Sequence, residues 1–113
     1  DVVYTVSAED WHSDHRMVAL AAQAAIRPHR TGVRRLIACE TISAGRGSIG
    51  CPTLYRDITA HLDRKVEILK LYASEYGRDS LRNEEAVRTW ARFRGAEVGR
   101  LAAEAFRLVW AVE

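Results

Sequence analysis

The chain has 113 residues and a mass of 12.7 kDa, a size at which one hydrophobic core is the rule. Seventeen Lys and Arg side chains against fifteen Asp and Glu give a formal net charge of +2, and the basic residues are scattered along the chain. A dense basic patch of the kind that binds a phosphate backbone is therefore absent from the sequence, which excludes nucleic acid as the leading partner.

The cysteine and hydropathy patterns exclude two further classes of protein. Cys39 and Cys51 form no CxxC pair, which argues against a disulfide scaffold and against a cysteine-based zinc cluster. The longest apolar run, Met17 to Ala22, is far shorter than the ~20 residues that span a bilayer. We therefore expect a cytoplasmic protein without a membrane span. The chain begins at Asp1 with neither an initiator Met nor a signal peptide, so we expect that an upstream segment is missing.

The first half of the chain has the pattern of a strand, a helix and a second strand. Val2 to Val6 is β-branched and aromatic and predicts a buried strand, and Val33 to Cys39 predicts another. Between them a helix is predicted from Ser13 or Asp14 to about Ile26, where Pro28 ends it. Its expected apolar stripe consists of Val18, Ala21, Ala22, Ala25 and Ile26. This order predicts a βαβ unit with two neighbouring strands, at whose carboxyl ends chemistry is commonly found.

The second half of the chain is predicted to be mainly helical and to end in a strand. The glycine-rich stretch Gly45 to Gly50 predicts a loop at the rim of a site, and a short extended piece from Leu54 to Ile58 follows. A helix is expected over about Ala60 to Tyr76 with Thr59 as its cap, and another after Asn83. The inner face of that last helix is expected to comprise Val87, Trp90, Ala91, Val98, Leu101 and Ala102, and the alternating Phe106, Leu108, Trp110 and Val112 predict the final strand. The sequence thus predicts a layered α/β fold.

The segment Asp10-Trp11-His12-Ser13-Asp14-His15-Arg16 has the pattern of a catalytic or metal site. Two histidines three residues apart in the first helical turn project to nearly the same side, and Asp14 between them is placed to orient an imidazole through its second nitrogen. A neutral imidazole is a good zinc ligand, and a second imidazole beside the metal can act as a general acid or polarise a carbonyl. These residue types and this spacing fit metal-assisted hydrolysis.

A plainer interpretation of the same pair stays open. His-x-x-His at a helix start also occurs by chance, with both rings exposed or one ring used as a cap, and a zinc site needs three protein ligands where the sequence offers a pair. The other two histidines, His29 and His61, are expected at the surface.

Four segments in order resemble the PIG-L/LmbE-type zinc-dependent N-deacetylases, and together they cover nearly the whole chain. Val3 to Arg16 looks like the family's strand followed by H-P-D-H-R. Tyr55-Arg56-Asp57-Ile58-Thr59 with Leu62 to Lys65 resembles Y-x-D-I-[ST]…L-x-x-K, and Tyr72-Ala73-Ser74-Glu75 resembles the SE segment. Arg92-Phe93-Arg94-Gly95, Gly99 and Ala103-Glu104-Ala105-Phe106 resemble the RG…G…AExF ending.

The resemblance implies a fold and a role for each residue of the motif. The fold would be a Rossmann-like three-layer αβα structure, with residues 1–113 forming a single partial domain, the C-terminal half of the deacetylase. His15 would be a zinc ligand. His12 would stabilise the oxyanion or protonate the departing amine, and Asp14 would hold His12 in place. We expect Asp10 and Trp11, which border the histidines, to contact the substrate.

The chain departs from the family's pattern in two places. Ser13 stands where the family usually has Pro, which loosens the turn into the helix, although serine can cap it. The A-H-P-D-D segment, which supplies the family's other zinc ligands and the base that activates water, does not occur in these 113 residues. We therefore expect the fragment alone to be inactive, because one ligand cannot hold zinc firmly.

The function implied by the resemblance is zinc-dependent hydrolysis of an N-acetyl group. The expected substrate is a small molecule, an N-acetylated amino sugar or its conjugate such as an N-acetylglucosaminyl group. The alternative, from another class of protein, is a metal-free interaction or structural module derived from a degenerate or truncated deacetylase. Assembly into a homo-oligomer is compatible with either function.

Overall fold

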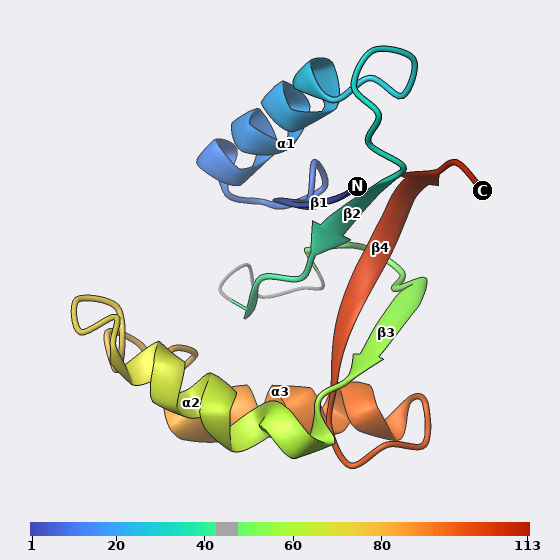
Figure 1. The fold of residues 1–113 in the computed structure, drawn as a ribbon. Coiled ribbons are helices and arrows are strands. Elements are labelled where there is room, and N and C mark those ends of the chain that lie inside the picture. The colour runs from blue at the N-terminus through green and yellow to red at the C-terminus, as the bar shows by residue number, and fades with distance from the viewer. Residues whose placement is uncertain (43–47) are drawn as a thin grey trace. The chain divides into compact units, whose positions relative to one another are not determined.

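The computed structural model describes residues 1–42 and 48–113, so residues 43–47 of the predicted glycine-rich loop lie outside the described residues. The elements follow one another as β1 (Val2–Val6), α1 (Ser13–Ala25), β2 (Arg35–Cys39), β3 (Leu54–Asp57), the 3-10 turn η2 (Thr59–His61), α2 (Leu62–Lys70), α3 (Glu84–Ala96) and β4 (Ala103–Ala111). In the part of the chain that is described, the strands form an open sheet in the order β1-β2-β4-β3 (Figure 1). The predicted α/β class is confirmed.

The chain divides into two compact units. Unit 1 comprises Asp1–Leu54 together with Ala105–Glu113, and unit 2 comprises Tyr55–Glu104. The whole of the predicted histidine site therefore belongs to unit 1. That the 113 residues make up a single partial domain stays a prediction.

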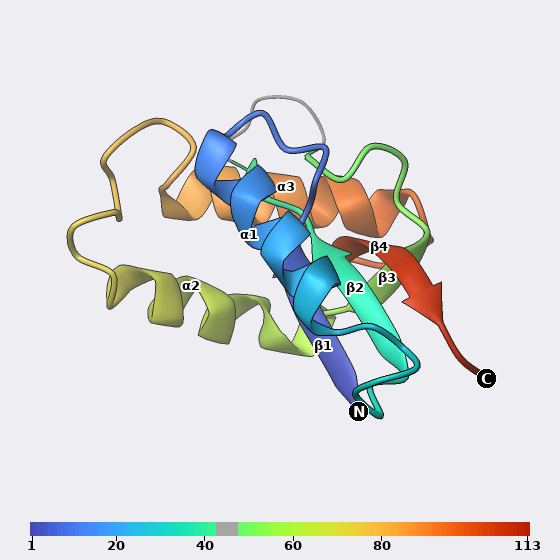
Figure 2. The ribbon, with the colours of Figure 1, turned by 90° about the horizontal axis from the view of Figure 1, so that it is seen from above.

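In unit 1, β1 and β2 pair in parallel, from Val2 opposite Arg35 to Val6 opposite Cys39. Helix α1 connects them and lies over β1, as the two views of the ribbon show (Figure 1, Figure 2). The other edge of β2 pairs antiparallel with β4, and the register shifts between Leu36 and Ile37. The expectation that Val2–Val6 lies next to the second strand, with the histidines following its carboxyl end, is confirmed.

Helix α1 has almost the predicted bounds but is rotated from the predicted face. Val18 and Ala21 are exposed, whereas Ala19 is fully buried and His15, Ala22 and Ile26 are partly buried. The side of α1 that is buried or partly buried therefore follows positions 15, 19, 22 and 26, which have helical spacing and include His15. Because apolar residues occur on nearly every side of this alanine-rich helix, apolar spacing alone did not determine its rotation.

In unit 2, the first helix is shorter than predicted. The turn η2 and helix α2 end at Lys70, while Leu71 and Tyr72 are 79% and 62% exposed. Past Leu71 the chain makes local turns, and Gly77 adopts a φ of +74°, which a helix does not allow. Thr59 is not the cap that was expected: its own amide is bound by the Asp57 carboxylate at 2.9 Å.

The last helix begins as predicted and ends earlier. The side chain of Asn83 caps α3 by accepting a hydrogen bond from the Ala86 amide at 2.9 Å. Val98 and Leu101, which were expected on the inner face, lie beyond the helix and are 40% and 78% exposed. The helix ends because Gly99 adopts a φ of +67° and the Arg100 amide turns back to donate to the Gly95 carbonyl at 2.9 Å. The returning chain lies so close that a Cβ on Gly95 would be 2.6 Å from the carbonyl oxygen of Arg100.

Each unit has its own buried apolar side chains. In unit 1 these include Ala19, Leu36, Ile37 and Ile49, and the half-exposed ring of Tyr4 lies edge-on to the buried Phe106 with ring centroids 5.6 Å apart. In unit 2 the buried Leu62, Ala91 and Ala102 form a cluster against which Ile58 packs. Among the described residues, none of the helices is both long enough and apolar enough to cross a bilayer.

Candidate functional site

The candidate site is built on the loop between β1 and α1, at the carboxyl end of β1. Its centre is the carboxylate of Asp10, whose side chain is 0% exposed. One oxygen, Oδ1, accepts a hydrogen bond from the His12 amide at 2.9 Å. The other, Oδ2, accepts from the Thr41 hydroxyl at 2.6 Å and lies 2.7 Å from Nδ1 of His15. Thr41 follows β2, so the carboxyl ends of two neighbouring parallel strands meet in this carboxylate.

The electrostatic environment keeps Asp10 ionised. Burial disfavours the charged carboxylate and is the largest influence on it. The hydrogen bonds from Thr41, from the His12 amide and from His15 together outweigh burial, so the pKa of Asp10 lies below its ordinary value of 3.8. An ionised carboxylate can only accept hydrogen bonds, and every group that contacts Asp10 must therefore donate.

His15 consequently has a defined tautomer. Because its Nδ1 faces an acceptor, Nδ1 carries the proton, and in the neutral ring Nε2 is left with a lone pair. The side chain is 28% exposed, and in the described part of the chain no hydrogen-bond partner contacts Nε2. His15 thus presents a lone pair in the form in which imidazole binds metals.

His12 has the opposite arrangement. It is the N-cap of α1, and its Nδ1 accepts a hydrogen bond from the Asp14 amide at 3.2 Å. An Nδ1 that accepts cannot carry the proton, so in the neutral ring the proton is on Nε2 and is available to an oxygen atom outside the loop. The His12 side chain is exposed.

The two rings lie together, as the three-residue spacing predicted. Their centroids are 4.7 Å apart, and the planes differ by 24°, so the imidazoles are stacked. One ring offers an N–H donor and its neighbour offers a lone pair. That combination can hold a cation at one nitrogen while the other donates to an oxygen of the same ligand.

Asp14 and Ser13 contribute differently from what the sequence predicted. The group of Asp14 that contacts His12 is its backbone amide, and the Asp14 carboxylate instead accepts a hydrogen bond from Ser13 Oγ at 3.1 Å. Ser13 could have capped the helix, but the capping side chain is His12, the use that the plainer interpretation of the histidine pair allowed for one of the two rings. Asp14 therefore holds His12 through a backbone atom that every residue possesses, and its catalytic role stays a prediction.

The two residues expected to contact the substrate lie in opposite environments. Trp11 is 70% exposed, which leaves its indole free to meet a ligand at the edge of the loop. Asp10 is buried, and both of its oxygens are already bound, so its contacts fit a role in orienting His15 better than a direct contact with substrate. Arg16 steadies this loop by donating to the backbone carbonyls of Asp10 and Trp11, at 3.0 and 2.7 Å.

Sequence reasoning missed Thr41 and Ser48. The Ser48 side chain is buried and its oxygen accepts a hydrogen bond from the Thr41 amide at 2.7 Å, which fixes the threonine beside Asp10. A signal for Thr41 was available: it is a polar residue two positions after the end of the second of two strands predicted to be neighbours. Ser48 lies in the glycine-rich stretch, whose pattern predicted a loop and no particular contact.

The donor set was compared with the needs of a zinc ion. His15 fits as one imidazole ligand because its ring is fixed by a carboxylate and Nε2 is accessible. Over residues 1–42 and 48–113, no cluster of three His, Cys, Asp or Glu side chains suited to a metal is present. The described residues therefore supply one good ligand toward the three that catalytic zinc sites usually have.

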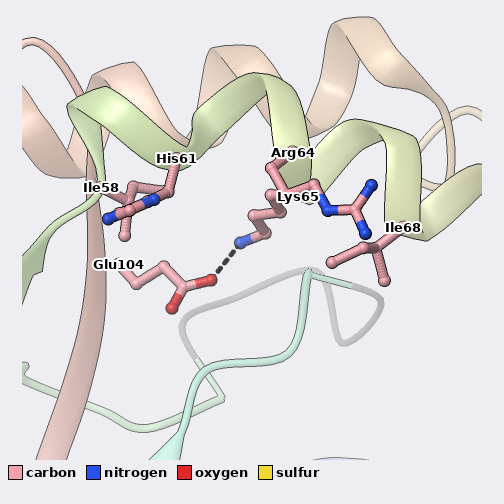
Figure 3. A pocket seen from close by; sticks show the side chains of 6 residues that line it. All are labelled: Ile58, His61, Arg64, Lys65, Ile68 and Glu104. Carbon is pink, nitrogen blue, oxygen red and sulfur yellow. Dashed lines mark hydrogen bonds and ion pairs between the residues drawn. The ribbon is translucent and has the colours of Figure 1, made fainter.

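Unit 2 has a hollow of its own, of about 260 Å³, beside η2 and α2 (Figure 3). It is lined by Ile58, His61, Arg64, Lys65, Ile68 and Glu104. Lys65 is paired with Glu104 at 2.5 Å, and Arg64 with Glu67 at 3.0 Å. Since these cations already have carboxylate partners, the hollow offers an anion little uncompensated charge. His61 and His29 are both exposed, as predicted.

Comparison with known proteins adds no relative: none of the protein-family models matches the chain, and no curated protein matches it. The four-segment resemblance and the geometry of the histidine loop are therefore the arguments on which a function can be proposed.

Proposed function

We propose that this chain is the zinc-ligand and acid-carrying part of a zinc-dependent N-deacetylase of the PIG-L/LmbE type, with a Rossmann-like three-layer αβα fold. The observation that carries the proposal is the pair of stacked imidazoles, to which their hydrogen-bond partners assign opposite tautomers. His15 offers a lone pair, as a metal ligand must. His12 offers an N–H, as a group that stabilises an oxyanion must.

The reaction that fits these groups is amide hydrolysis. Zinc, when bound, polarises the acetamide carbonyl and makes a water molecule a better nucleophile. His12 Nε2–H, in the neutral ring, donates a hydrogen bond to the oxygen on which negative charge develops. To pass a proton to the nitrogen as the C–N bond breaks, His12 would have to be the imidazolium, whose protonated Nδ1 must give up the hydrogen bond from the Asp14 amide. Acetate and a free amine leave. The remaining ligands and the base are, by resemblance, those of an A-H-P-D-D segment, which the 113 residues do not contain.

The substrate class in this proposal is an N-acetylated amino sugar or its conjugate, handled in the cytoplasm. The resemblance supplies the class, and the exposed Trp11 supports it, because an indole face packs well on the apolar face of a sugar ring. Its neighbour His12 would then meet the acetamido group.

The test separates the two histidines in the protein expressed from its complete reading frame. His15→Ala should lose zinc, whereas His12→Ala should retain zinc and lose turnover by about 10²–10³-fold, as expected for an oxyanion stabiliser or general acid. Bound metal and amine release from an N-acetylglucosamine substrate are measured together. His29→Ala, an exposed histidine outside the loop, is the matched control and should change neither. Loss of zinc in His12→Ala with retention in His15→Ala would exchange the two roles.

The second candidate is a metal-free interaction or structural module. It is favoured by the Asp10 network itself, since hydrogen bonds to Thr41 and the His12 amide would also fix the loop without any ligand. For a module, zinc titration of the complete protein would give no binding, and His15→Ala would affect only stability.

A further inference from the structure

The two carboxylate oxygens of Asp10 have different hydrogen-bond partners. Oδ1 faces the backbone amide of His12, a group that can only donate. Oδ2 faces Thr41 Oγ1 and His15 Nδ1, groups that can donate or accept according to where their protons lie. The carboxylate is 0% exposed and lies in the loop before α1, where both of its oxygens are held by hydrogen bonds, so it does not face water.

We propose that Asp10 is a positioning residue that fixes His15 as the Nδ1–H tautomer and holds its ring with Nε2 outward. The hydroxyl of Thr41 shares Oδ2 with His15, and Thr41 is itself fixed by Ser48. Residues after two neighbouring strands thereby determine which nitrogen of His15 has the lone pair. In this assignment the carboxylate that binds His15 is the buried Asp10. The carboxylate of Asp14, which lies between the two histidines in sequence, does not bind His15.

The proposal gives a sharp expectation for Asp10→Asn, which preserves size and shape. The amide oxygen must stay at the Oδ1 position, because the His12 amide needs an acceptor there. The amide nitrogen then takes the Oδ2 position and donates one proton to Thr41 Oγ1 and the other to His15 Nδ1. His15 Nδ1 is forced to accept, so the ring must move its proton to Nε2. Replacing one oxygen of residue 10 by a nitrogen thus converts His15 from the Nδ1–H to the Nε2–H tautomer and removes the lone pair from its Nε2.

The consequence for metal binding rests on the proposed function. An imidazole that carries its proton on Nε2 must lose or move that proton before Nε2 can bind zinc. Partners of metal-bound histidines typically contribute 10–100-fold to metal affinity. Asp10→Asn should therefore weaken zinc binding by about 10–100-fold, even though it leaves His15 in place.

The experiment reads the tautomers directly, without metal. Protein labelled with ¹⁵N at histidine is studied by long-range proton–nitrogen correlation at about pH 9, where imidazoles are neutral. Wild-type protein should show His15 as Nδ1–H and His12 as Nε2–H. Asp10→Asn should shift His15 to Nε2–H and leave His12 unchanged. Asp14→Asn is the matched control and should leave His15 as Nδ1–H, because the Asp14 carboxylate does not contact that ring.

The outcomes are distinguishable. His15 found as Nε2–H in the wild type, or as Nδ1–H in a folded Asp10→Asn, would overturn the positioning role; the wild-type spectrum decides even if the variant fails to fold. Titration of the complete protein with zinc alone, in competition with a chelator, then tests the link to metal. An inverted tautomer with unchanged zinc affinity would keep the positioning role and refute His15 as a zinc ligand.

Discussion

Unit 1 has a buried carboxylate at the point where its strands end, whereas the carboxylates of unit 2 that form ion pairs lie at or near the surface. Asp10 collects three hydrogen bonds inside unit 1, while Glu104 pairs with Lys65 at 35% and 37% side-chain exposure. Unit 2 buries the charged side chain of Arg94, which is 6% exposed, but this guanidinium forms an ion pair with the partly exposed Glu97 at 2.8 Å. The rest of its interior is apolar around Leu62 and closely packed at Gly95. The candidate site thus differs from the hollow of unit 2. In the site a buried carboxylate uses its hydrogen bonds to orient another side chain, whereas in the hollow the charged side chains pair with one another.

The largest expected effect is at Asp10. Asp10→Ala leaves the Thr41 hydroxyl, the His12 amide and His15 Nδ1 without their acceptor, and should lower the free energy of unfolding by about 3 kcal/mol. Glu104→Ala, which removes a half-exposed ion pair, should cost less than about 1 kcal/mol. Chemical denaturation of both variants measures the difference. Equal costs would mean that the buried network is no more important to folding than a surface pair.

The close packing of unit 2 is tested by Gly95→Ala. The added methyl would lie 2.6 Å from the Arg100 carbonyl oxygen and 2.8 Å from the Ala102 nitrogen, both backbone atoms that cannot swing aside. We expect a loss of about 2 kcal/mol. Gly99→Ala is the matched control: it has open space but a φ of +67°, which should cost about 1 kcal/mol. Thermal unfolding measures the loss of stability in both variants. A smaller loss in Gly95→Ala than in Gly99→Ala would contradict the close approach of Gly95 to the backbone of Arg100 and Ala102.

At Thr5 in unit 1 we expect a substitution to stabilise the protein, because the side chain has a buried polar atom, Oγ1, without a hydrogen-bond partner among the described residues. Thr5→Val keeps the branched shape, removes the hydroxyl, and should raise the free energy of unfolding by about 1 kcal/mol. Thr5→Ser, which keeps the hydroxyl and loses the methyl group, should lower it. A destabilised Thr5→Val would show that the hydroxyl does have a partner.

The smallest effect expected is a titration in unit 2. Hydrogen bonding from the Thr59 side chain, and next from its amide, lowers the pKa of Asp57 below its ordinary 3.8. Since the folded-state pKa is the lower one, this contribution to stability is present above pH 3.8 and is lost as the pH falls through the folded-state value. Thr59→Val should raise the pKa of Asp57, as followed by carboxyl ¹³C shifts, while Thr53→Val in unit 1 should leave it unchanged.

The sequence predicted the elements of unit 1 and the pairing of its first two strands because their periodicities are clear. Its predictions for the helices of unit 2 were too long, since an apolar residue such as Leu101 continues the helical spacing although the chain has already turned. The predicted face of α1 was right at Ala22 and Ile26 and wrong at Val18, Ala21 and Ala25, which are exposed. The side of α1 that is buried or partly buried includes His15, whose contact with Asp10 at 2.7 Å is polar, and apolar periodicity does not register such a contact.

The same reasoning applies to the site. The stacking of His12 and His15 follows from their spacing, so it was predictable. The partner of His15 was not, because a buried carboxylate five residues away and a threonine from the next strand are brought together only by the fold. Asp14 was the nearer choice in sequence, and proximity in sequence was the wrong guide to which carboxylate contacts an imidazole.

The division of unit 1 into two stretches of sequence affects how the protein is made. Strand β2 is complete once residue 39 has been synthesised, but its neighbour β4 contains Phe106 to Ala111, and Glu9 is bound by Arg107. All of unit 2 is translated in between. During synthesis, one edge of β2 therefore stays unpaired until the last residues of β4 leave the ribosome. All of unit 2 has been synthesised by then and can fold first. Pairings between such distant residues also slow folding, so we expect unit 1, which holds the candidate site, to be the last part of the chain to form.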